Sequence, residues 1–464
     1  MNKIQSIIAT IALTASLPWA LPAAAQYSES GYFNDGYLYR HEMNPAIGND
    51  QNYVAMPAIS NVNVELQGNI GISDVLFNRN GRTTTFLNPN VSTEEFLAGI
   101  HDKNKLAADV KIQVLGFGFK GFKGYNHFSI NARSNVGALI PGSLLRLAKE
   151  GVENKEYDIS DLEAQANAYV EVALGHSHRI NDHLDIGATA KILVGAGHAD
   201  AQFEKAHLTL HENQWNAVTN ATLQASIKGL TYKEETKMRG PEGEQRPHTY
   251  VSGMDFDKFG VNGVGAALDL GAVYRLNDSW TLSASLLDLG FISWSNNMVA
   301  STNGDRTFTT DTYLFVIDDE ADNKFSREMD RLGEGVAALY ELNNNGDEGS
   351  RTTKLAPAMN LGIEYTVPGY KQLSFGLLGS SRFNGAFSYT DVRLSTNWRV
   401  KKLLSLGVNV AVGTYGAGFG WMFNFHPKGF NLFVGSDHML GRLAKQGIPL
   451  SCNGHVNLGI NYPF

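Results

Sequence analysis

The chain ends in the segment Gly454-His455-Val456-Asn457-Leu458-Gly459-Ile460-Asn461-Tyr462-Pro463-Phe464. Successive side chains of a β-strand point to opposite faces, so this segment would have one apolar and one polar face. The apolar face carries Val456, Leu458, Ile460, Tyr462 and Phe464, and the polar face carries His455, Asn457, Gly459 and Asn461. A strand that separates lipid from a polar lumen needs about 9–11 residues of this alternation.

The same alternation recurs along the chain, and the connections between the alternating stretches have two lengths. Further alternating stretches lie at 128–133, 183–194, 264–274 and 404–412. Short polar turns occur at 179–182, 275–278, 367–371, 399–402 and 426–429, and long segments at 73–107, 135–164, 231–262, 291–353 and 438–453. Short turns at one end of the strands and long loops at the other are typical of an outer-membrane barrel. Soluble β-sandwiches rarely sort their loops in this way.

We therefore expect an all-β fold, a transmembrane antiparallel β-barrel of 14–16 strands formed by residues 61–464. Its first strand is expected at 62–72, and the ambiguous stretch 195–216 leaves counts of 14 and 16 open. Helical spacing within the long segments predicts short helices in the extracellular loops, at 92–100, 141–151 and 325–340. Ser92 and Glu95 have the spacing of a capping box.

Composition and charge exclude several classes of protein. The 464 residues include 48 glycines and one cysteine, which rules out an intrachain disulfide framework and a cysteine-cluster metal site. The net charge is −8 and the chain has no basic tract, so nucleic acid is not expected as a partner. The mean hydropathy of −0.20 argues against a helical membrane protein. It is compatible with a barrel, in which polar residues alternate with apolar ones.

The first 25 residues have the features of an export signal. Lys3 supplies a positive charge, a short apolar stretch follows, and Ala23-Ala24-Ala25 supplies the small residues of a cleavage site before Gln26. The apolar run is shorter than the ~20 residues of a spanning helix, so a membrane anchor is the weaker alternative. We expect export to the outer membrane of a Gram-negative cell.

Aromatic residues mark the ends of the strands beside the short turns. Tyr274, Trp280, Tyr365, Trp398 and Tyr462 share the parity of the apolar face of their strands. Aromatic rings favour the headgroup layer, so these residues are expected to form an interfacial girdle facing outer-membrane lipid, although sandwich-core aromatics are an alternative. The terminal Phe464, with Tyr462, resembles the signal by which outer-membrane barrels are recognised by their assembly machinery.

Residues 26–60 lack the alternation of the rest of the chain. They contain three glycines, two prolines and six aromatic residues in an irregular order. This composition suits a compact hatch, or plug, that fills the lumen, and a disordered tail is the alternative. A barrel of 14–16 strands encloses more space than side chains of the wall alone can fill.

Two short motifs resemble those of known barrels. Asn44-Pro45-Ala46 resembles the Asn-Pro-Ala motif in the N-terminal hatch of FadL-type transporters and of the related PorV-like barrels of type IX secretion. The segment 286–294, Leu-Leu-Asp-Leu-Gly-Phe-Ile-Ser-Trp, looks like a strand-end signature of an uncharacterised family of such barrels. The resemblance implies a fourteen-stranded barrel with its N-terminal segment in the lumen. It also implies either transport of small apolar or amphipathic compounds, or a partner in a secretion system.

Parity also places charged residues on the lumen side. These residues are expected to pair across the barrel and to brace the plug, and they are Arg133, Glu171, Asp185, Lys191, Asp269, Glu364, Asp391 and Arg393. Three glycines, at 416, 418 and 420, share one face of another stretch. They would provide either a groove for plug or ligand, or a bend in the strand.

Residues suited to metal or catalytic chemistry are few. His176 and His178 share a face, but no third ligand can be assigned, and a two-histidine set is incomplete. The acidic stretch 318–323 resembles a calcium loop, but it lacks the glycine at the sixth position, and Met329 replaces the final Glu. No Ser-His pair stands out. We expect no cofactor, metal or catalytic site.

Three function classes remain open. A transport barrel for small apolar or amphipathic compounds comes first, and a structural or partner-binding surface barrel comes second. An outer-membrane hydrolase comes last, and it would require a Ser, a His and an acid to converge.

Overall fold

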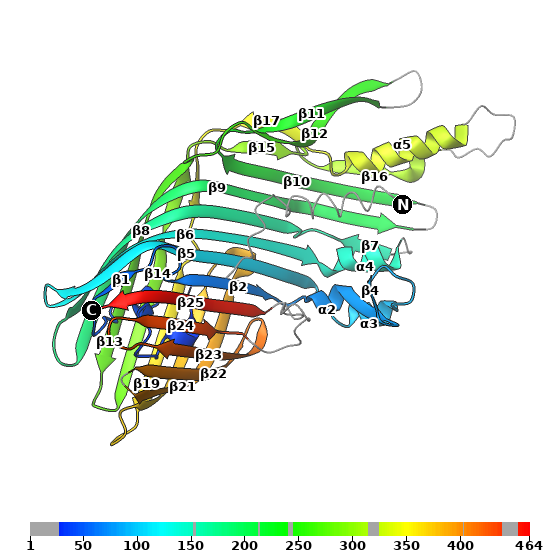
Figure 1. Cartoon of the computed structure of the whole chain (residues 1–464). Helices are drawn as coiled ribbons and strands as arrows, with labels where there is room; N and C mark the ends of the chain where they lie inside the picture. Colours follow the sequence, from blue (N-terminus) through cyan, green and yellow to red (C-terminus); the bar gives the residue numbers. More distant parts are fainter. Residues whose placement is uncertain are drawn as a thin grey trace.

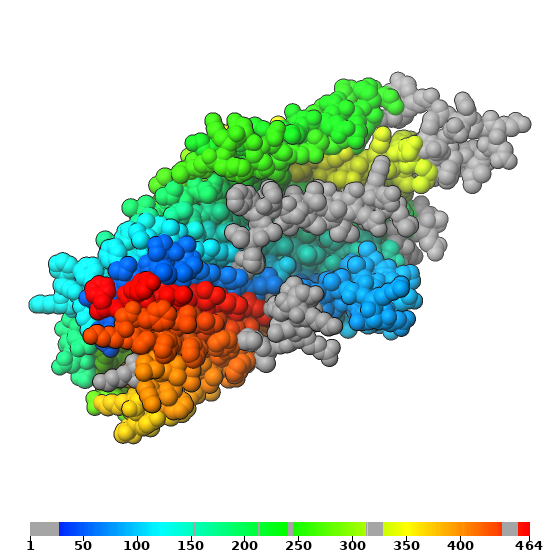
Figure 2. All heavy atoms as spheres, in the orientation of Figure 1, coloured from blue at the N-terminus to red at the C-terminus, as the bar shows by residue number. Residues whose placement is uncertain are grey.

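The structure is a computed structural model that describes residues 27–151, 155–211, 214–239, 245–313, 324–401, 403–438 and 453–464. Its strands form one antiparallel sheet that closes on itself as a barrel (Figure 1). The closure joins the first and last strands of the wall, because β25 (Gly454–Pro463) pairs with β1 (Tyr53–Ala55) and β2 (Val62–Gly68). Figure 2 shows the red C-terminal strands packed against blue N-terminal residues at this junction. No helix among the described residues is long and apolar enough to span a membrane.

The described residues form fourteen wall positions, which fixes the count that the sequence left open. The stretch 195–216 does not form an extra pair of strands, because β9 continues as one strand from Leu184 to Leu210. After β1 and β2, the wall strands in order are β5 (Lys103–Gly121), β6 (Gly124–Pro141), β8 (Glu163–Arg179), β9 (Leu184–Leu210), β13 (Gly263–Arg275), β14 (Trp280–Trp294), β19 (Ala358–Thr366), β20 (Leu373–Arg382), β21 (Tyr389–Lys401), β22 (Leu404–Gly413), β23 (Gly416–Phe425), β24 (Asn431–Ser436) and β25.

On one side the wall extends well past the rest of the barrel. Residues 184–195 of β9 pair with β13, and residues 197–210 pair with β10 (Trp215–Ile227). The strands β10 and β13 therefore occupy one wall position, interrupted by the inserted hairpin β11 (Leu230–Arg239) and β12 (Arg246–Phe256). Figure 1 shows β8, β9 and β10 reaching beyond the shorter strands β20–β25.

Short strands complete the side of the wall that extends past the rest of the barrel. The strands β15 (Met298–Ser301) and β16 (Arg306–Thr309) continue β14 and pair with β10. The next position contains β17 (Asn343–Asp347) and β18 (Arg351–Lys354) ahead of β19. At the top of β8, β7 (Lys155–Asp158) pairs with the end of β9.

The predicted loop helices are present. They are α3 (Thr93–Leu97), α4 (Gly142–Glu150) and α5 (Lys324–Ala338), and the Ser92 hydroxyl caps α3 by accepting the Glu95 amide at 3.1 Å. Other small elements are η1 (Glu29–Gly31), η2 (Arg40–Glu42), α2 (Ile72–Val75), β3 (Leu76–Arg79), β4 (Arg82–Thr85), η3 (Thr310–Thr312) and η4 (Gly385–Phe387). The expected signal peptide at 1–25 and the acidic stretch at 318–323 lie outside the described residues.

The outer face of the wall is apolar, as the alternation predicts. In β22, Val408, Val410 and Val412 are 48%, 53% and 66% exposed. Trp280, Trp398 and the other predicted girdle residues lie beside the short turns. A belt of exposed aliphatic residues bordered by aromatic rings is the surface that a barrel presents to lipid. This is the fold of outer-membrane barrels.

Candidate functional site

Residues 27–52, here called the plug, lie inside the barrel. The plug contains η1 and η2 but no strand. Its residues are mostly buried, and its contacts reach opposite sides of the wall. Glycines permit this close fit, because an added Cβ at Gly36 would lie 2.5 Å from Asn424 Nδ2 of β23, and one at Gly420 would lie 2.5 Å from Ser30 Oγ. Of the predicted glycine strip of β23, Gly420 therefore faces the first turn of the plug, whereas a Cβ at Gly418 would meet His438 and one at Gly416 would meet nothing within 4 Å.

An aromatic cluster forms the centre of the plug. Tyr32, Tyr37 and Tyr39 are at most 1% exposed and pack with wall residues such as Phe433. The rings of Tyr37 and Phe433 meet edge to face with centroids 5.0 Å apart. Irregularly spaced aromatics thus form a small core shared between plug and wall.

The Asn44-Pro45-Ala46 motif anchors the plug to β13 and β14. Asn44 Nδ2 donates to the carbonyl oxygens of Ala272 and Ala284, each at 3.2 Å, and its Oδ1 accepts the Ala46 amide at 3.0 Å. Wall glycines admit the motif, since a Cβ at Gly271 would overlap Asn44. One asparagine therefore bridges two wall strands while it fixes the turn of the plug.

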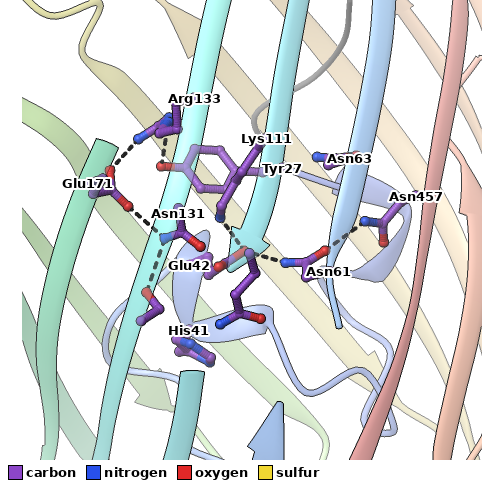
Figure 3. A network of polar contacts seen from close by, with 12 residues as sticks. Tyr27, His41, Glu42, Asn61, Asn63, Lys111, Asn131, Arg133, Glu171 and Asn457 are labelled. Carbon is purple, nitrogen blue, oxygen red and sulfur yellow. Dashed lines mark hydrogen bonds and ion pairs between the residues drawn. The ribbon is translucent and has the colours of Figure 1, made fainter. Parts of the chain in front are cut away.

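Glu42 links the plug to the wall through charge. Its carboxylate lies 2.6 Å from the ammonium of Lys111 on β5, which is 1% exposed, and accepts Asn61 Nδ2 at 3.0 Å. Asn61 in turn accepts Asn457 Nδ2 of β25 at 2.9 Å (Figure 3). Burial, with the nearby Lys111 charge, lowers the pKa of His41 to about 3, so this plug imidazole is neutral.

A second charged contact holds the start of the plug. The Asp437 carboxylate, just past β24, accepts the backbone amides of Glu29 at 2.8 Å and Ser30 at 2.6 Å. Arg393 Nη2 on β21 lies 2.9 Å from the Glu29 carboxylate and 3.0 Å from that of Asp391. Two ion pairs, at Glu29 and Glu42, thus tie the plug to buried wall cations.

Six buried charges from six wall strands meet beside the plug and form what we call the crossbar. Lys191 Nζ lies 2.7 Å from Asp269 and 2.7 Å from Asp288, and Arg133 Nη1 lies 3.1 Å from Asp288. The three cations balance the three carboxylates, and no member is more than 7% exposed. The members are Arg133, Glu171, Lys191, Asp269, Asp288 and Arg382. Figure 3 shows Arg133 and Glu171 with Tyr27 of the plug beside them.

Asp288 reaches the crossbar because β14 breaks its own alternation. Its φ of +56° coincides with a register shift against β13, so Leu286 and Leu289 both face outward and Asp288 faces inward. Such a bulge reverses the parity of a strand. Alternation alone misses Asp288. The usable signal is an aspartate flanked by leucines in a spanning strand.

The eight lumen residues named from the sequence fall into several places. Arg133, Glu171, Lys191 and Asp269 belong to the crossbar, while Asp391 and Arg393 lie at the start of the plug. The other two lie nearer the short turns. Asp185 pairs with Arg275 and Arg179, and Glu364 shares the inward face of Gly362, against which Tyr32 packs. Sequence analysis did not name Lys111, Asp288, Arg382 or Asp437.

A small cavity lies between the plug and the crossbar. Its walls include Tyr27 and Met43 of the plug and Arg382 and Tyr389 of the wall, and its volume is about 20 Å³. This space accommodates roughly one water molecule. A larger compound can pass this point only when the plug or the crossbar moves.

Other candidate chemistry is sparse in the described part of the chain. His176 Nε2 lies 3.3 Å from His178 Nδ1. In the described part of the chain, no group of three or more His, Cys, Asp and Glu side chains is placed to hold a metal ion. Ser405 Oγ lies 2.9 Å from His426 Nε2, the geometry of a nucleophile and base. However, Ser405 is only 3% exposed.

Comparison with known protein families gives one match, over residues 45–437, to a family of unknown function, DUF5723. The chain belongs to the DUF5723 family. The DUF5723 match begins at Pro45 in the plug motif and ends at Asp437, which holds the first turn of the plug. This membership agrees with the expected uncharacterised family. No curated protein sequence matches the chain.

Solved structures similar to this DUF5723 protein include FadL-type barrels. The Ralstonia pickettii toluene transporter TbuX is 8% identical, with 96% of this chain and 95% of that chain covered and a TM-score of 0.40. A Pseudomonas aeruginosa FadL homologue is 8% identical, with 96% and 98% covered and a TM-score of 0.37. A mutant of the monoaromatic hydrocarbon channel TodX is 8% identical, with 96% of both chains covered and a TM-score of 0.41.

Proposed function

We propose that this DUF5723 barrel transports a small apolar or amphipathic compound across the outer membrane, and that the plug is the part that moves. The observation that carries this proposal is the filled lumen. The gap between plug and crossbar has a volume of about 20 Å³, so transport requires displacement. The plug enters the barrel as one N-terminal segment, and it can shift without unpairing the strands of the wall.

The layers of the lumen favour an amphipathic compound. On the long-loop side of the crossbar, six apolar residues form a buried cluster on the inner face, namely Tyr169, Leu193, Ala267, Ile292, Trp294 and Leu355. Three of them, Tyr169, Leu193 and Ala267, lie two positions from the crossbar residues of β8, β9 and β13, on the side of the long loops. A compound that approaches from the long loops would meet apolar side chains first and charged groups second. An apolar body with a polar end suits this order.

A reversible tether tests the movement of the plug. Ser30 on the plug and Gly420 on β23 approach closely enough for Ser30→Cys and Gly420→Cys to form a disulfide. The native Cys452 is replaced by serine in every variant. Uptake of the apolar fluorescent probe N-phenyl-1-naphthylamine is then measured in outer-membrane vesicles, oxidised and reduced.

The proposal requires that oxidation slows uptake and that reductant restores it. The two single-cysteine variants serve as controls and should show no response to oxidation. Equal uptake by the oxidised and reduced double variant, with the disulfide verified by mass, would rule out plug movement as the route.

A partner-binding barrel, including a secretion-associated one, is the second candidate function. It is favoured by an apolar stripe on α5, where Met329 and Val336 lie on one helical face and are 45% and 37% exposed, and by Tyr340 just past the helix, which is 38% exposed. It becomes the leading function if the tethered plug leaves uptake unchanged.

A further inference from the structure

The short-turn end of the barrel carries a charge opposite to that of the whole protein. The six short turns, taken as 119–124, 179–185, 274–279, 367–372, 398–403 and 426–430, contain nine Lys or Arg and three Asp or Glu. Their net charge is +6 in a chain whose net charge is −8. Each of the six turns contributes at least one cation, so the positive charge forms a ring.

Most of these cations are free to meet a partner outside the protein. Six side chains in five of the turns are exposed, namely Lys120, Lys123, Arg179, Lys371, Lys401 and Lys428. Where they have acidic neighbours the contacts are loose, such as the 3.6 Å between Lys371 and Asp278, both strongly exposed. Exposed ion pairs of this kind contribute little.

The ring of cations lies at the same depth as the interfacial aromatic residues. Arg275 follows Tyr274, Lys371 follows Tyr370, and Arg399 follows Trp398. Trp398 Nε1 donates to the Tyr370 hydroxyl at 3.0 Å, which joins two neighbouring turns. Amphipathic rings settle at the level of lipid headgroups, so the adjacent cations lie at the level of the phosphates.

The turn between β5 and β6 has the clearest lipid-binding chemistry. Phe122 is 80% exposed at its tip, between Lys120 and Lys123. Phe122 and Lys123 adopt positive φ angles of 54° and 62°, a conformation that side chains other than glycine, asparagine and aspartate rarely adopt. The exposed ring of Phe122 can insert among acyl chains while the ammonium groups of the two lysines beside it bind lipid phosphate.

We propose that the short-turn end is a binding surface for anionic phospholipid headgroups of the periplasmic leaflet. Lipid headgroups surround a barrel on all sides, so a ring of cations interleaved with interfacial aromatics matches them. A binding site for an acidic protein would instead be a patch of cations on one side of the barrel. Each cation near an anionic lipid surface strengthens the attraction to that surface. This inference does not depend on what passes through the lumen.

The test counts bound lipids on the full-length mature barrel by native mass spectrometry. Purified protein in detergent is mixed with equal amounts of phosphatidylglycerol and phosphatidylcholine. The rim variant carries Lys120→Gln, Lys123→Gln, Lys401→Gln and Lys428→Gln. A matched control changes four exposed lysines at the long-loop end by the same charge, with Lys103→Gln, Lys205→Gln, Lys233→Gln and Lys237→Gln.

We expect wild type and control to retain about tenfold more phosphatidylglycerol than phosphatidylcholine, and the rim variant to lose this preference. The change in electrophoretic mobility on heating shows whether each variant is folded. If the rim variant fails to fold, Lys120→Gln with Lys123→Gln alone is used, and a partial loss is expected. The proposal is overturned if wild type shows no preference, or if rim and control variants lose it equally.

Discussion

The crossbar and the plug contacts use different chemistry within one lumen. In the crossbar, wall strands are tied to one another by six buried charges, with Asp288 at the centre. The plug has two ion pairs with buried wall cations and one looser, exposed pair between Asp35 and Arg399 at 3.6 Å. Many of its other polar contacts are neutral, such as those of Asn44 with two wall carbonyls. Wall glycines such as Gly271 and Gly420 let the plug approach the wall closely.

This difference separates what must stay from what can move. Removing one partner of a buried ion pair costs about 3–5 kcal/mol, because the remaining charge has lost its solvent and its partner. A neutral hydrogen bond contributes about 0.5–1.5 kcal/mol. The wall is therefore fixed where β6, β9, β14 and β20 meet, and the plug can detach through a series of smaller steps.

The largest effect is expected at the centre of the crossbar. Asp288→Ala leaves Lys191, Arg133 and Arg382 with an excess of buried positive charge, and should lower the free energy of unfolding by about 3–5 kcal/mol. Urea unfolding of the barrel in detergent measures this. The control is Asp278→Ala, whose carboxylate is 92% exposed. A loss below about 1 kcal/mol would show that the crossbar does not hold the wall.

The next effect should be local to the plug. Glu42→Gln leaves the buried Lys111 ammonium without its carboxylate and should loosen the plug by up to about 3 kcal/mol. Uptake of N-phenyl-1-naphthylamine should rise, while the urea midpoint of the wall changes little. Adding Lys111→Met should restore slow uptake, since neither charge then remains. If Glu42→Gln unfolds the wall as readily as Asp288→Ala does, the two regions are not separate.

A smaller effect is expected at the turn of the plug motif. Asn44→Ala removes the hydrogen bonds to Ala272 and Ala284 and should weaken plug docking by about 1–3 kcal/mol. Protease cleavage within residues 27–52 of the folded barrel should become faster. Asn90→Ala, in an exposed loop, is the control and should leave cleavage unchanged. Equal cleavage of both variants would mean that Asn44 does not anchor the plug.

The smallest effect is expected at single amide contacts of the wall. Asn431 Nδ2 donates to the Gly36 carbonyl at 3.3 Å, and Asn431→Ala should weaken docking by about 0.5–1.5 kcal/mol. The same cleavage assay should show a smaller change than Asn44→Ala gives. A larger change for Asn431→Ala than for Asn44→Ala would mean that Asn431 contributes more to plug docking than Asn44 does.

Local alternation was sufficient to predict the barrel and its apolar face, and it placed four of the six crossbar residues on the lumen side. Helical spacing predicted the loop helices. It could not resolve β10 and β13 as one wall position, because the hairpin inserted between them separates residues that are neighbours only in the sheet. It missed Asp288 because a bulge reverses parity within β14. Arg382 was missed because its partner lies 94 residues away, and the sequence carries no signal for that pairing.

The most direct test of the central claim is hydrogen exchange of the native barrel, followed by mass spectrometry. Peptides from residues 28–43 report on the plug, and peptides from 286–294 report on the crossbar strand. If the plug detaches while the wall stays closed, the plug amides exchange faster than those of β14, and Glu42→Gln accelerates only the plug. If both peptides exchange at one rate and respond together to Glu42→Gln, plug and wall open as a single unit and the account is contradicted.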